Sequence, residues 1–263
     1  MAERNEIIHY HEEDGASVII LLNNPPVNAL SLRMLEELDR AIQNFSKSRH
    51  LKAAILTSAI EPVFSAGADI GELRNSSVDK VHDIVRQAQQ VFARIEGMPK
   101  VVIAAINGVC FGGGNELAMA CDIRVASEKA QCGQPEIALG LMPGWGGTQR
   151  LPRLVGKTAA MELLLTGKSV SANEAYRLGL VNRVVPHHEL LNVAKKMAES
   201  FAAAPQASIQ AVKKSVTQGL SMSLEDGLHL ETHLFMQVAQ TNDAQEGMEA
   251  FLQKRPPVFA GGQ

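Results

Sequence analysis

The stretch NGVCFGGGNELAMACD, residues 107–122, is the part of this 263-residue chain around which its fold and its candidate site are organised. Three consecutive glycines at 112–114 separate the apolar run VVIAAI (101–106) from a short helical pattern at 116–120. A strand, a glycine turn and a helix in this order point free backbone N–H groups along a helix axis whose N-terminus carries partial positive charge. The sequence therefore predicts a pocket for an anion or a developing oxyanion.

Two carboxylates accompany this junction. Glu116 opens the helical pattern, and Glu136 follows in GQPEIALG, just before the glycine-rich LMPGWGGTQRL (141–151). Either acid could instead be a first-turn helix residue favoured by the helix dipole. Three loops of small residues, FSAGAD, FGGGNEL and PGWGGT, favour a site, because each can bring backbone close to a ligand. We expect two carboxylates beside a backbone oxyanion pocket.

Composition limits the possible partners and compartment. With 46% hydrophobic residues, the chain can bury a full core as one large domain or as one domain with an appendage. A net charge of -3 and a pI near 6.3 give no reason to expect nucleic acid or an anionic membrane as partner. The three cysteines favour buried thiols over disulfides. Residues 1–15 resemble no signal peptide, and no apolar window spans a membrane, so we expect a soluble, cytoplasmic protein.

Hydrophobic periodicity predicts an α/β chain of repeated strand, loop and helix units. Ser31 is the expected N-cap of the first helix, and FSAGADIGEL (64–73) is expected to be a loop. From residue 148 the pattern is mostly helical, and 190–253 contain no convincing strand, which predicts a core at 1–189 and a helical segment at 190–263. The expected strands are 17–22, 53–57, 101–106, 123–126, 130–133 and 181–185, and the first two helices are 31–45 and 78–95.

Four known functional motifs are nearly matched in this chain, but each lacks a required residue. The two Gly-Lys pairs at 156–157 and 167–168, which are the P-loop candidates, are interpreted as turns that join helices. The failing residues are Leu117 for a dinucleotide fingerprint, Leu151 and Glu162 for P-loops, Val63 for a nucleophile elbow, and Leu230 for a zinc helix carrying His229 and His233.

Six stretches of the chain are informative through their joint order and spacing: PPVNALS (25–31), FSAGADI (64–70), VIAAINGVCFGGGNELAMACDIRVAS (102–127), CGQPEIALGLMPGWGGTQRLPRLVG (132–156), LTGKSVSANEAYRLGLVNRVV (165–185) and EGMEAFLQKR (246–255). Together they resemble the crotonase superfamily and within it the enoyl-CoA hydratases. The resemblance implies a spiral of ββα repeats followed by a helical C-terminal segment, homo-oligomers that are trimers or dimers of trimers, and a coenzyme A thioester as substrate.

The resemblance also implies roles for individual residues. The backbone N–H groups of Ala68 and Gly113 would form the oxyanion hole for the thioester carbonyl. Glu116 would act as base toward a water and Glu136 as acid toward the α-carbon, giving reversible hydration of 2-trans-enoyl-CoA to 3-hydroxyacyl-CoA in fatty acid β-oxidation or related acyl-CoA metabolism. This reaction needs no metal and no cofactor apart from the coenzyme A of the substrate.

Contacts to coenzyme A are implied mainly for the backbone at 66–71 and for Gly113. Trp145 stands where the family more often has a small residue; it either narrows the acyl pocket or only packs. The implied contact residues are Ala66, Ala68, Asp69, Ile70, Gly71 and Gly113, with Arg33 and Lys254 as candidates for the phosphates, the latter across a subunit interface.

Two other functions stay open at this point. A Δ3,Δ2-enoyl-CoA isomerase would shuttle an α proton with one carboxylate and would not need the second. A noncatalytic or RNA-associated relative would act through its oligomer surface, but the chain has no lysine-rich helix to support RNA binding.

Overall fold

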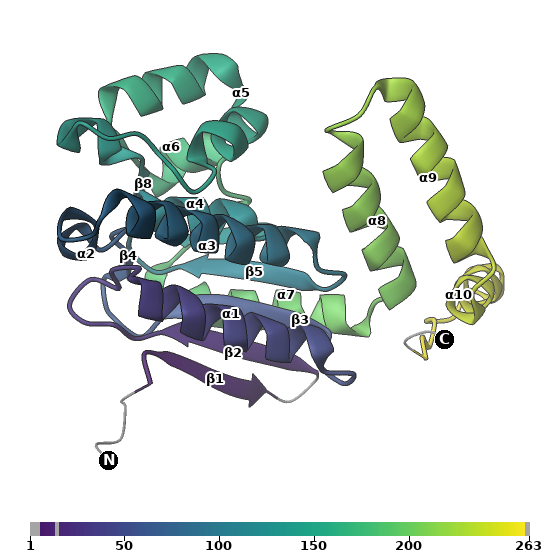
Figure 1. Cartoon of the computed structure of the whole chain (residues 1–263). Coiled ribbons are helices and arrows are strands. Elements are labelled where there is room, and N and C mark those ends of the chain that lie inside the picture. The colour runs from purple at the N-terminus through teal and green to yellow at the C-terminus, as the bar shows by residue number, and fades with distance from the viewer. Residues whose placement is uncertain (1–5, 14–15, 261–263) are drawn as a thin grey trace.

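A computed structural model describes residues 6–13 and 16–260 and has two β-sheets (Figure 1). The larger sheet has the strand order β1-β2-β3-β5-β7-β10, which largely follows the order of the strands along the chain. Only the β1–β2 pair is antiparallel, and the other neighbours are parallel. The strands are β1 (Ile8–Glu13), β2 (Ser17–Leu22), β3 (Ala53–Ser58), β5 (Val101–Ile106), β7 (Ile123–Ser127) and β10 (Arg183–Val185).

The smaller sheet runs alongside with the order β4-β6-β8-β9, and only its β8–β9 pair is antiparallel. Three successive turns, which begin at β3, β5 and β7, each add one strand to the larger sheet, then one to the smaller, and then a helix. This arrangement confirms the predicted spiral of ββα units. The strands are β4 (Val63–Ser65), β6 (Val109–Phe111), β8 (Gln131–Gly133) and β9 (Ser169–Ser171).

Helices cover both faces of the larger sheet. On one face lie α1 (Leu32–Lys47) and α3 (Val78–Gly97), whose buried apolar stripes join the main hydrophobic core. Ser31 caps α1 as predicted, since its hydroxyl accepts from the Met34 amide at 3.2 Å. On the other face α7 (Leu190–Ala203) packs through Leu190, Ala194 and Ala198 in a second apolar cluster.

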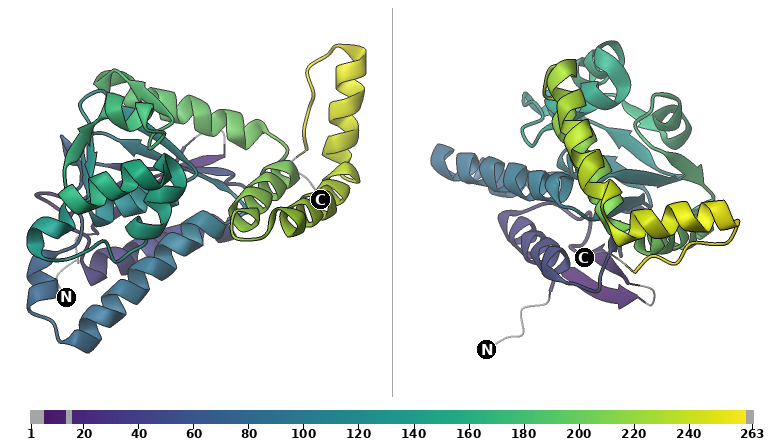
Figure 2. Two further views of the ribbon diagram at one scale, coloured as in Figure 1. Left: turned by 90° about the horizontal axis from the view of Figure 1, so that it is seen from above. Right: turned by 90° about the vertical axis from the view of Figure 1, so that its right-hand side faces the viewer.

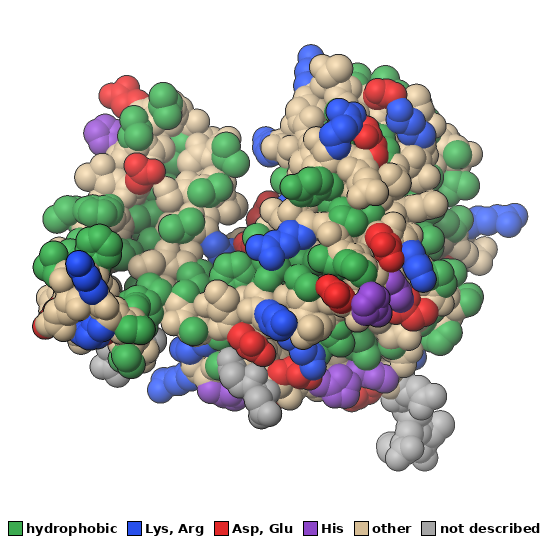
Figure 3. Space-filling view, turned by 180° about the vertical axis from the view of Figure 1, so that it is seen from behind, with side chains coloured by type: hydrophobic (Ala, Val, Ile, Leu, Met, Phe, Trp, Pro, Cys, Tyr) green, Lys and Arg blue, Asp and Glu red, His purple; other side chains and the backbone are tan. Residues whose placement is uncertain are grey.

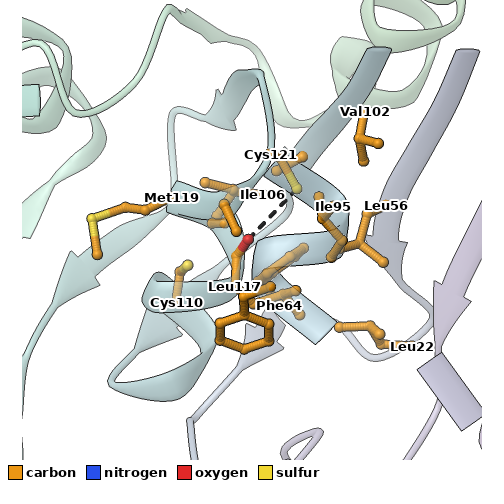
Figure 4. Packing of buried hydrophobic residues seen from close by; sticks show 14 of the residues in the cluster. Leu22, Leu56, Phe64, Ile95, Val102, Ile106, Cys110, Leu117, Met119 and Cys121 are labelled. Carbon is orange, nitrogen blue, oxygen red and sulfur yellow. Dashed lines mark hydrogen bonds between the residues drawn. The ribbon is translucent and has the colours of Figure 1, made fainter. Parts of the chain in front are cut away.

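The short helix α4 (Gly113–Ala120) lies in the middle of the core, and all of its residues are buried. Figure 4 shows its Leu117 next to Phe64, in one apolar cluster with Leu22 and Ile106, and these three neighbours in the cluster come from different turns of the spiral. Glu116 therefore stands on a helix that is surrounded by apolar side chains, and its carboxyl group has lost most of its contact with water.

Three further helices form a C-terminal arm, residues 206–260, that projects from the rest of the chain (Figure 2). They are α8 (Gln206–Gly219), α9 (Leu224–Ala239) and α10 (Asn242–Gln253). Lys213 of α8 ties the arm to the core, because its ammonium lies 2.7 Å from Asp122 Oδ2 and 2.6 Å from the Lys100 carbonyl. As predicted, 190–253 is helical without a strand. The division at residue 189 stays a prediction, since α7 belongs with the sheet.

The structure adds elements that the sequence did not indicate. The outer strand β1 carries mostly partly exposed polar residues, so it lacks an apolar signal. The expected loop 64–73 contains the end of β4 and begins α2 (Ile70–Arg74), which Asp69 caps by accepting from the Glu72 amide at 2.9 Å. The strand expected at 181–185 begins only at residue 183, because Asn182 uses its side chain to pair with the Arg124 amide.

The remaining helices lie between β8 and α7 in the sequence. The Gly156-Lys157 pair is a break inside α5 (Gly147–Thr166) with Gly156 at φ 78°, which confirms a turn between two helical segments. The prediction for the second pair is wrong in one respect: Gly167 ends α5, but the chain continues into strand β9 and not into a helix. The three cysteines are buried and free, also as predicted. Among the described residues no helix has the length and apolarity to cross a bilayer. These elements are η1 (Pro135–Leu139), α5 (Gly147–Thr166), α6 (Ala172–Arg177) and η2 (His187–Glu189).

Candidate active site

Glu116 is held by the loop that precedes α5. Its Oε1 accepts hydrogen bonds from the Trp145 amide at 2.8 Å and the Gly147 amide at 2.7 Å, and the residue is 2% exposed. We call residues 143–147 the clamp loop. Two backbone donors on one carboxylate oxygen fix the direction of the side chain, and they leave Oε2 without a hydrogen bond to any described residue.

The surroundings of Glu116 set its acidity. Burial raises its pKa to about 7, and the neighbouring carboxyl of Glu136 also raises it. The amides of Gly147 and Trp145 and the charge of Arg150 act in the opposite direction. A carboxyl group that titrates near neutral pH can both accept and return a proton at low cost, which is the property that general acid–base catalysis needs.

Glu136 approaches the same glycine turn from η1. Its Oε1 would lie 3.1 Å from a methyl group added at Gly112, so this carboxyl faces the start of α4. Burial raises the pKa of Glu136 as well. Its Oε2 is buried and has no hydrogen-bond partner among the described residues. The structure thus brings the two predicted acids to one place.

The amides of Ala68 and Gly113 are adjacent because β4 and β6 are parallel neighbours whose carboxyl ends meet. A methyl group added at Gly113 would lie 3.4 Å from the Ala68 nitrogen, and one at Gly67 would lie 3.1 Å from the Gly113 nitrogen. Neither N–H donates to an acceptor within the described parts of the chain. Two adjacent free donors can together stabilise one negatively charged oxygen.

Trp145 packs against the same backbone. Its indole is 4% exposed and meets Phe92 edge to face at 6.1 Å between ring centroids. A methyl group added at Gly113 would lie only 2.4 Å from Cζ3 of the indole, so only glycine fits there. On its other side Trp145 borders a cavity of about 730 Å3 between the core and α8, and Figure 3 shows the molecule hollowed between core and arm. Packing is therefore observed, and the acyl-pocket role stays a prediction.

The expected coenzyme A contacts are only partly assembled within one chain. Ala68 forms a parallel bridge with Leu30, which places the 66–71 backbone near the start of α1. Arg33 stands on that helix, and its Nε lies 2.9 Å from Glu37 Oε1. Lys254 ends α10, which packs on α9 in the arm, so this chain does not bring it to the other site residues.

A family model described as enoyl-CoA hydratase/isomerase matches residues 12–262. The chain belongs to this family. It is 40% identical to the short-chain-enoyl-CoA hydratase of Clostridium acetobutylicum over 93% of this chain and 94% of that protein. It is also 40% identical to the crotonyl-CoA hydratase of Syntrophomonas wolfei, over 98% and 99% of the two chains. A crystal structure of enoyl-CoA hydratase from Bacillus anthracis, 39% identical, superimposes with a TM-score of 0.93 over 97% of this chain and all of that one.

The enoyl-CoA hydratase/isomerase site contains features that the sequence reasoning missed. Gln134 is 1% exposed, and neither atom of its amide group has a hydrogen-bond partner in the described structure. A methyl group at Gly147 would lie 2.4 Å from its Nε2, so this amide lies beside the clamp loop. Its only sequence signal is its position directly before Pro135 and Glu136. The clamp loop's two donors to Glu116 had no signal, because they are backbone groups.

Metal-binding residues are not gathered anywhere in the part of the chain that the structure describes, where no group of three His, Cys, Asp or Glu side chains could hold an ion. His229 and His233 lie on α9 of the arm, away from the two acids, and His233 contacts Gln237 at 3.2 Å. Both histidines are exposed on the surface of the arm.

Proposed function

We propose that the protein catalyses the reversible addition of water to 2-trans-enoyl-CoA, giving 3-hydroxyacyl-CoA, in fatty acid β-oxidation or related acyl-CoA metabolism. The observation that carries this proposal is the meeting of one buried and one half-buried carboxyl group with two free backbone amides at one glycine turn. Relatives of about 40% identity that are named short-chain-enoyl-CoA and crotonyl-CoA hydratase support the same substrate class.

In this proposal the thioester oxygen accepts hydrogen bonds from the Ala68 and Gly113 amides. Glu116 takes a proton from water, the resulting hydroxide adds to carbon 3, and negative charge moves to the thioester oxygen. Glu136 then gives a proton to carbon 2, and no electrons leave the substrate. Each preorganised donor to the oxygen stabilises the transition state by about 3 kcal/mol. The reaction in this form uses no metal and no cofactor apart from the coenzyme A of the substrate.

Substrate binding and assembly complete the proposal. The backbone at 66–71 and Arg33 would contact coenzyme A, and Lys254 would reach the phosphates of a coenzyme A bound to another subunit. We place the protein in the cytoplasm as a homo-oligomer, a trimer or a dimer of trimers. Large apolar side chains exposed on the arm support the assembly: Val212, Val216, Leu220, Leu224, Phe235, Phe251 and Leu252.

Crotonyl-CoA hydration, followed by loss of the enoyl-thioester absorbance, tests the proposal. Glu116→Gln and Glu136→Gln should each lower kcat by about 10²- to 10⁴-fold, because each removes a proton-transfer group. Both variants should still bind a 3-hydroxyacyl-CoA with a Kd close to that of the wild type, because the change is isosteric. Activity within tenfold of wild type in either variant would remove that acid from the mechanism.

A parallel assay with 3-enoyl-CoA separates hydration from isomerisation. An isomerase needs one carboxylate to move the α proton, whereas hydration needs both acids. Faster conversion of 3-enoyl-CoA than of 2-enoyl-CoA would favour the Δ3,Δ2-isomerase alternative.

A further inference from the structure

The clamp loop that holds Glu116 is itself held by side chains outside the site. Gln89 of α3 donates to the Gly144 carbonyl at 2.8 Å. Arg150 of α5 donates through Nη1 to the Trp145 carbonyl at 3.1 Å. The backbone of Trp145 therefore links two side chains. Its N–H donates to Glu116, and its C=O accepts from Arg150.

Arg150 is fixed in turn by Glu96. Its Nη2 and Nε lie 2.9 and 3.3 Å from the same carboxylate oxygen of Glu96, and the arginine side chain is 15% exposed. A planar guanidinium held on one edge by a carboxylate presents its remaining donors in fixed directions. One of them, on Nη1, donates to the Trp145 carbonyl.

Gly146 makes this arrangement possible. Its φ of 119° lies in the left-handed region, and a methyl group added there would lie 2.1 Å from Arg150 Nη1. Any larger residue would displace the guanidinium as well as strain the loop. In PGWGGT, Gly146 leaves space for the Arg150 guanidinium, and Gly147 donates its amide hydrogen to Glu116.

The supporting side chains of α3 come from one face of that helix. Gln89, Phe92 and Glu96 are spaced by three and four residues, so they lie along one line on the helix surface. They contact the Gly144 carbonyl, the Trp145 indole and Arg150 respectively. One helix therefore supports the loop directly at two points and, through Arg150, at a third.

We propose that Arg150, fixed by Glu96, is a positioning residue for Glu116 and acts on it through the clamp loop. Gln89 contributes a second support at the Gly144 carbonyl. Arg150 lines the cavity beside α8, and that lining includes neither Glu116 nor Glu136. The inference rests on the proposed role of Glu116 as base.

The charged groups that act on Glu116 give the expected sign of a pH effect. Glu136 from η1 raises the pKa of Glu116, and Arg150 from α5 lowers it. Loss of Arg150 removes a nearby positive charge and loosens an amide donor, and both changes make the carboxylate harder to form. The acidic limb of kcat/KM should move to higher pH.

The first experiment compares Arg150→Met with Arg150→Lys and with the control Arg153→Met. Arg153 stands on the same helix and borders the same cavity, but among the described residues it donates only to Gln149. We expect Arg150→Met to lower kcat about tenfold or more and to change KM less than about threefold. Its acidic limb should rise by about half a pH unit or more. Arg150→Lys should recover part of kcat, and the control should match wild type.

A double-variant experiment tests whether Arg150 acts through Glu116. Residues that act as one unit are not additive, so Arg150→Met should cost less than about twofold in a Glu116→Gln background. A purely structural role would lower activity by the same factor in both backgrounds and leave the acidic limb in place, and that result would overturn the inference. If Arg150→Met does not fold, Glu96→Gln and Gln89→Met are tested in the same way with the same criteria.

The two proposals fail in different ways. If Glu116→Gln keeps activity within tenfold of wild type, the proposed base is wrong. If Glu116→Gln loses activity but Arg150→Met, Glu96→Gln and Gln89→Met all leave kcat and the acidic limb at wild-type values, only the positioning inference is wrong.

Discussion

Glu116→Gln should stabilise the protein at alkaline pH while it removes activity. The carboxyl group is almost fully buried, and burial is the main cause that raises its pKa to about 7. In the unfolded chain the same group has its ordinary pKa of 4.5. The folded protein therefore keeps a proton that the unfolded chain has already lost between these two pH values.

The sign and size of the effect follow from linkage. A raised pKa in the folded state means that stability falls as pH rises from about 4.5 to about 7 and is constant above that range. The difference between 7 and 4.5, at 1.36 kcal/mol per pH unit, corresponds to a cost of about 3 kcal/mol. Glutamine keeps the acceptor for the Trp145 and Gly147 amides but carries no charge, so it avoids this cost.

Unfolding curves at pH 5 and pH 8 measure the effect. The variant should exceed wild type by roughly 2–3 kcal/mol at pH 8, or about 6 °C in Tm, and by less than about 1 kcal/mol at pH 5. Glu162→Gln is the control, because Glu162 is exposed on α5. Equal stability of variant and wild type at pH 8, or a difference that does not change with pH, would refute the reasoning.

Two further outcomes are expected. Trp145→Ala should shift kcat/KM from four-carbon toward ten-carbon enoyl-CoA, by up to about fourfold for each methylene that enters the vacated space, at 0.8 kcal/mol per group. An unchanged ratio between the two substrates, with a Tm lowered by the loss of about 3–5 kcal/mol, would mean that the indole only packs. Dialysis against EDTA should leave hydration activity unchanged, and loss of activity that a metal restores would contradict the proposed chemistry.

Much of the fold could be predicted because its repeats leave local signals. The strands β2, β3 and β5 are apolar and buried, and α1 and α3 carry apolar stripes with serine caps. By contrast, β1 presents histidine and glutamate on an outer strand, so its place depends on pairing with β2. The short β4 follows from its neighbours in the smaller sheet rather than from its own residues.

The candidate site likewise has residues that the sequence could predict and residues that it could not. Glu116 and Glu136 could be singled out because a carboxylate beside a glycine turn has a recognisable chemistry. The support of Glu116 could not, since Gln89 and Glu96 lie on a helix whose exposed positions look like an ordinary solvated face. Their role depends on the path of the clamp loop, which only the assembled structure shows.

The spiral also affects how the chain folds and where it opens locally. Along the larger sheet each strand pairs with the strand of the preceding turn, so most contacts are between neighbouring turns, as in repeat proteins. Structure can therefore grow from a nucleus in either direction. A substitution in the middle strands β3 or β5 weakens the pairing with two neighbouring strands at once. A substitution in β10 weakens the pairing with β7 alone, and the other turns can still form. Local opening is consequently cheapest at the two ends of the sheet and most costly near β5, the strand that leads into α4 and Glu116.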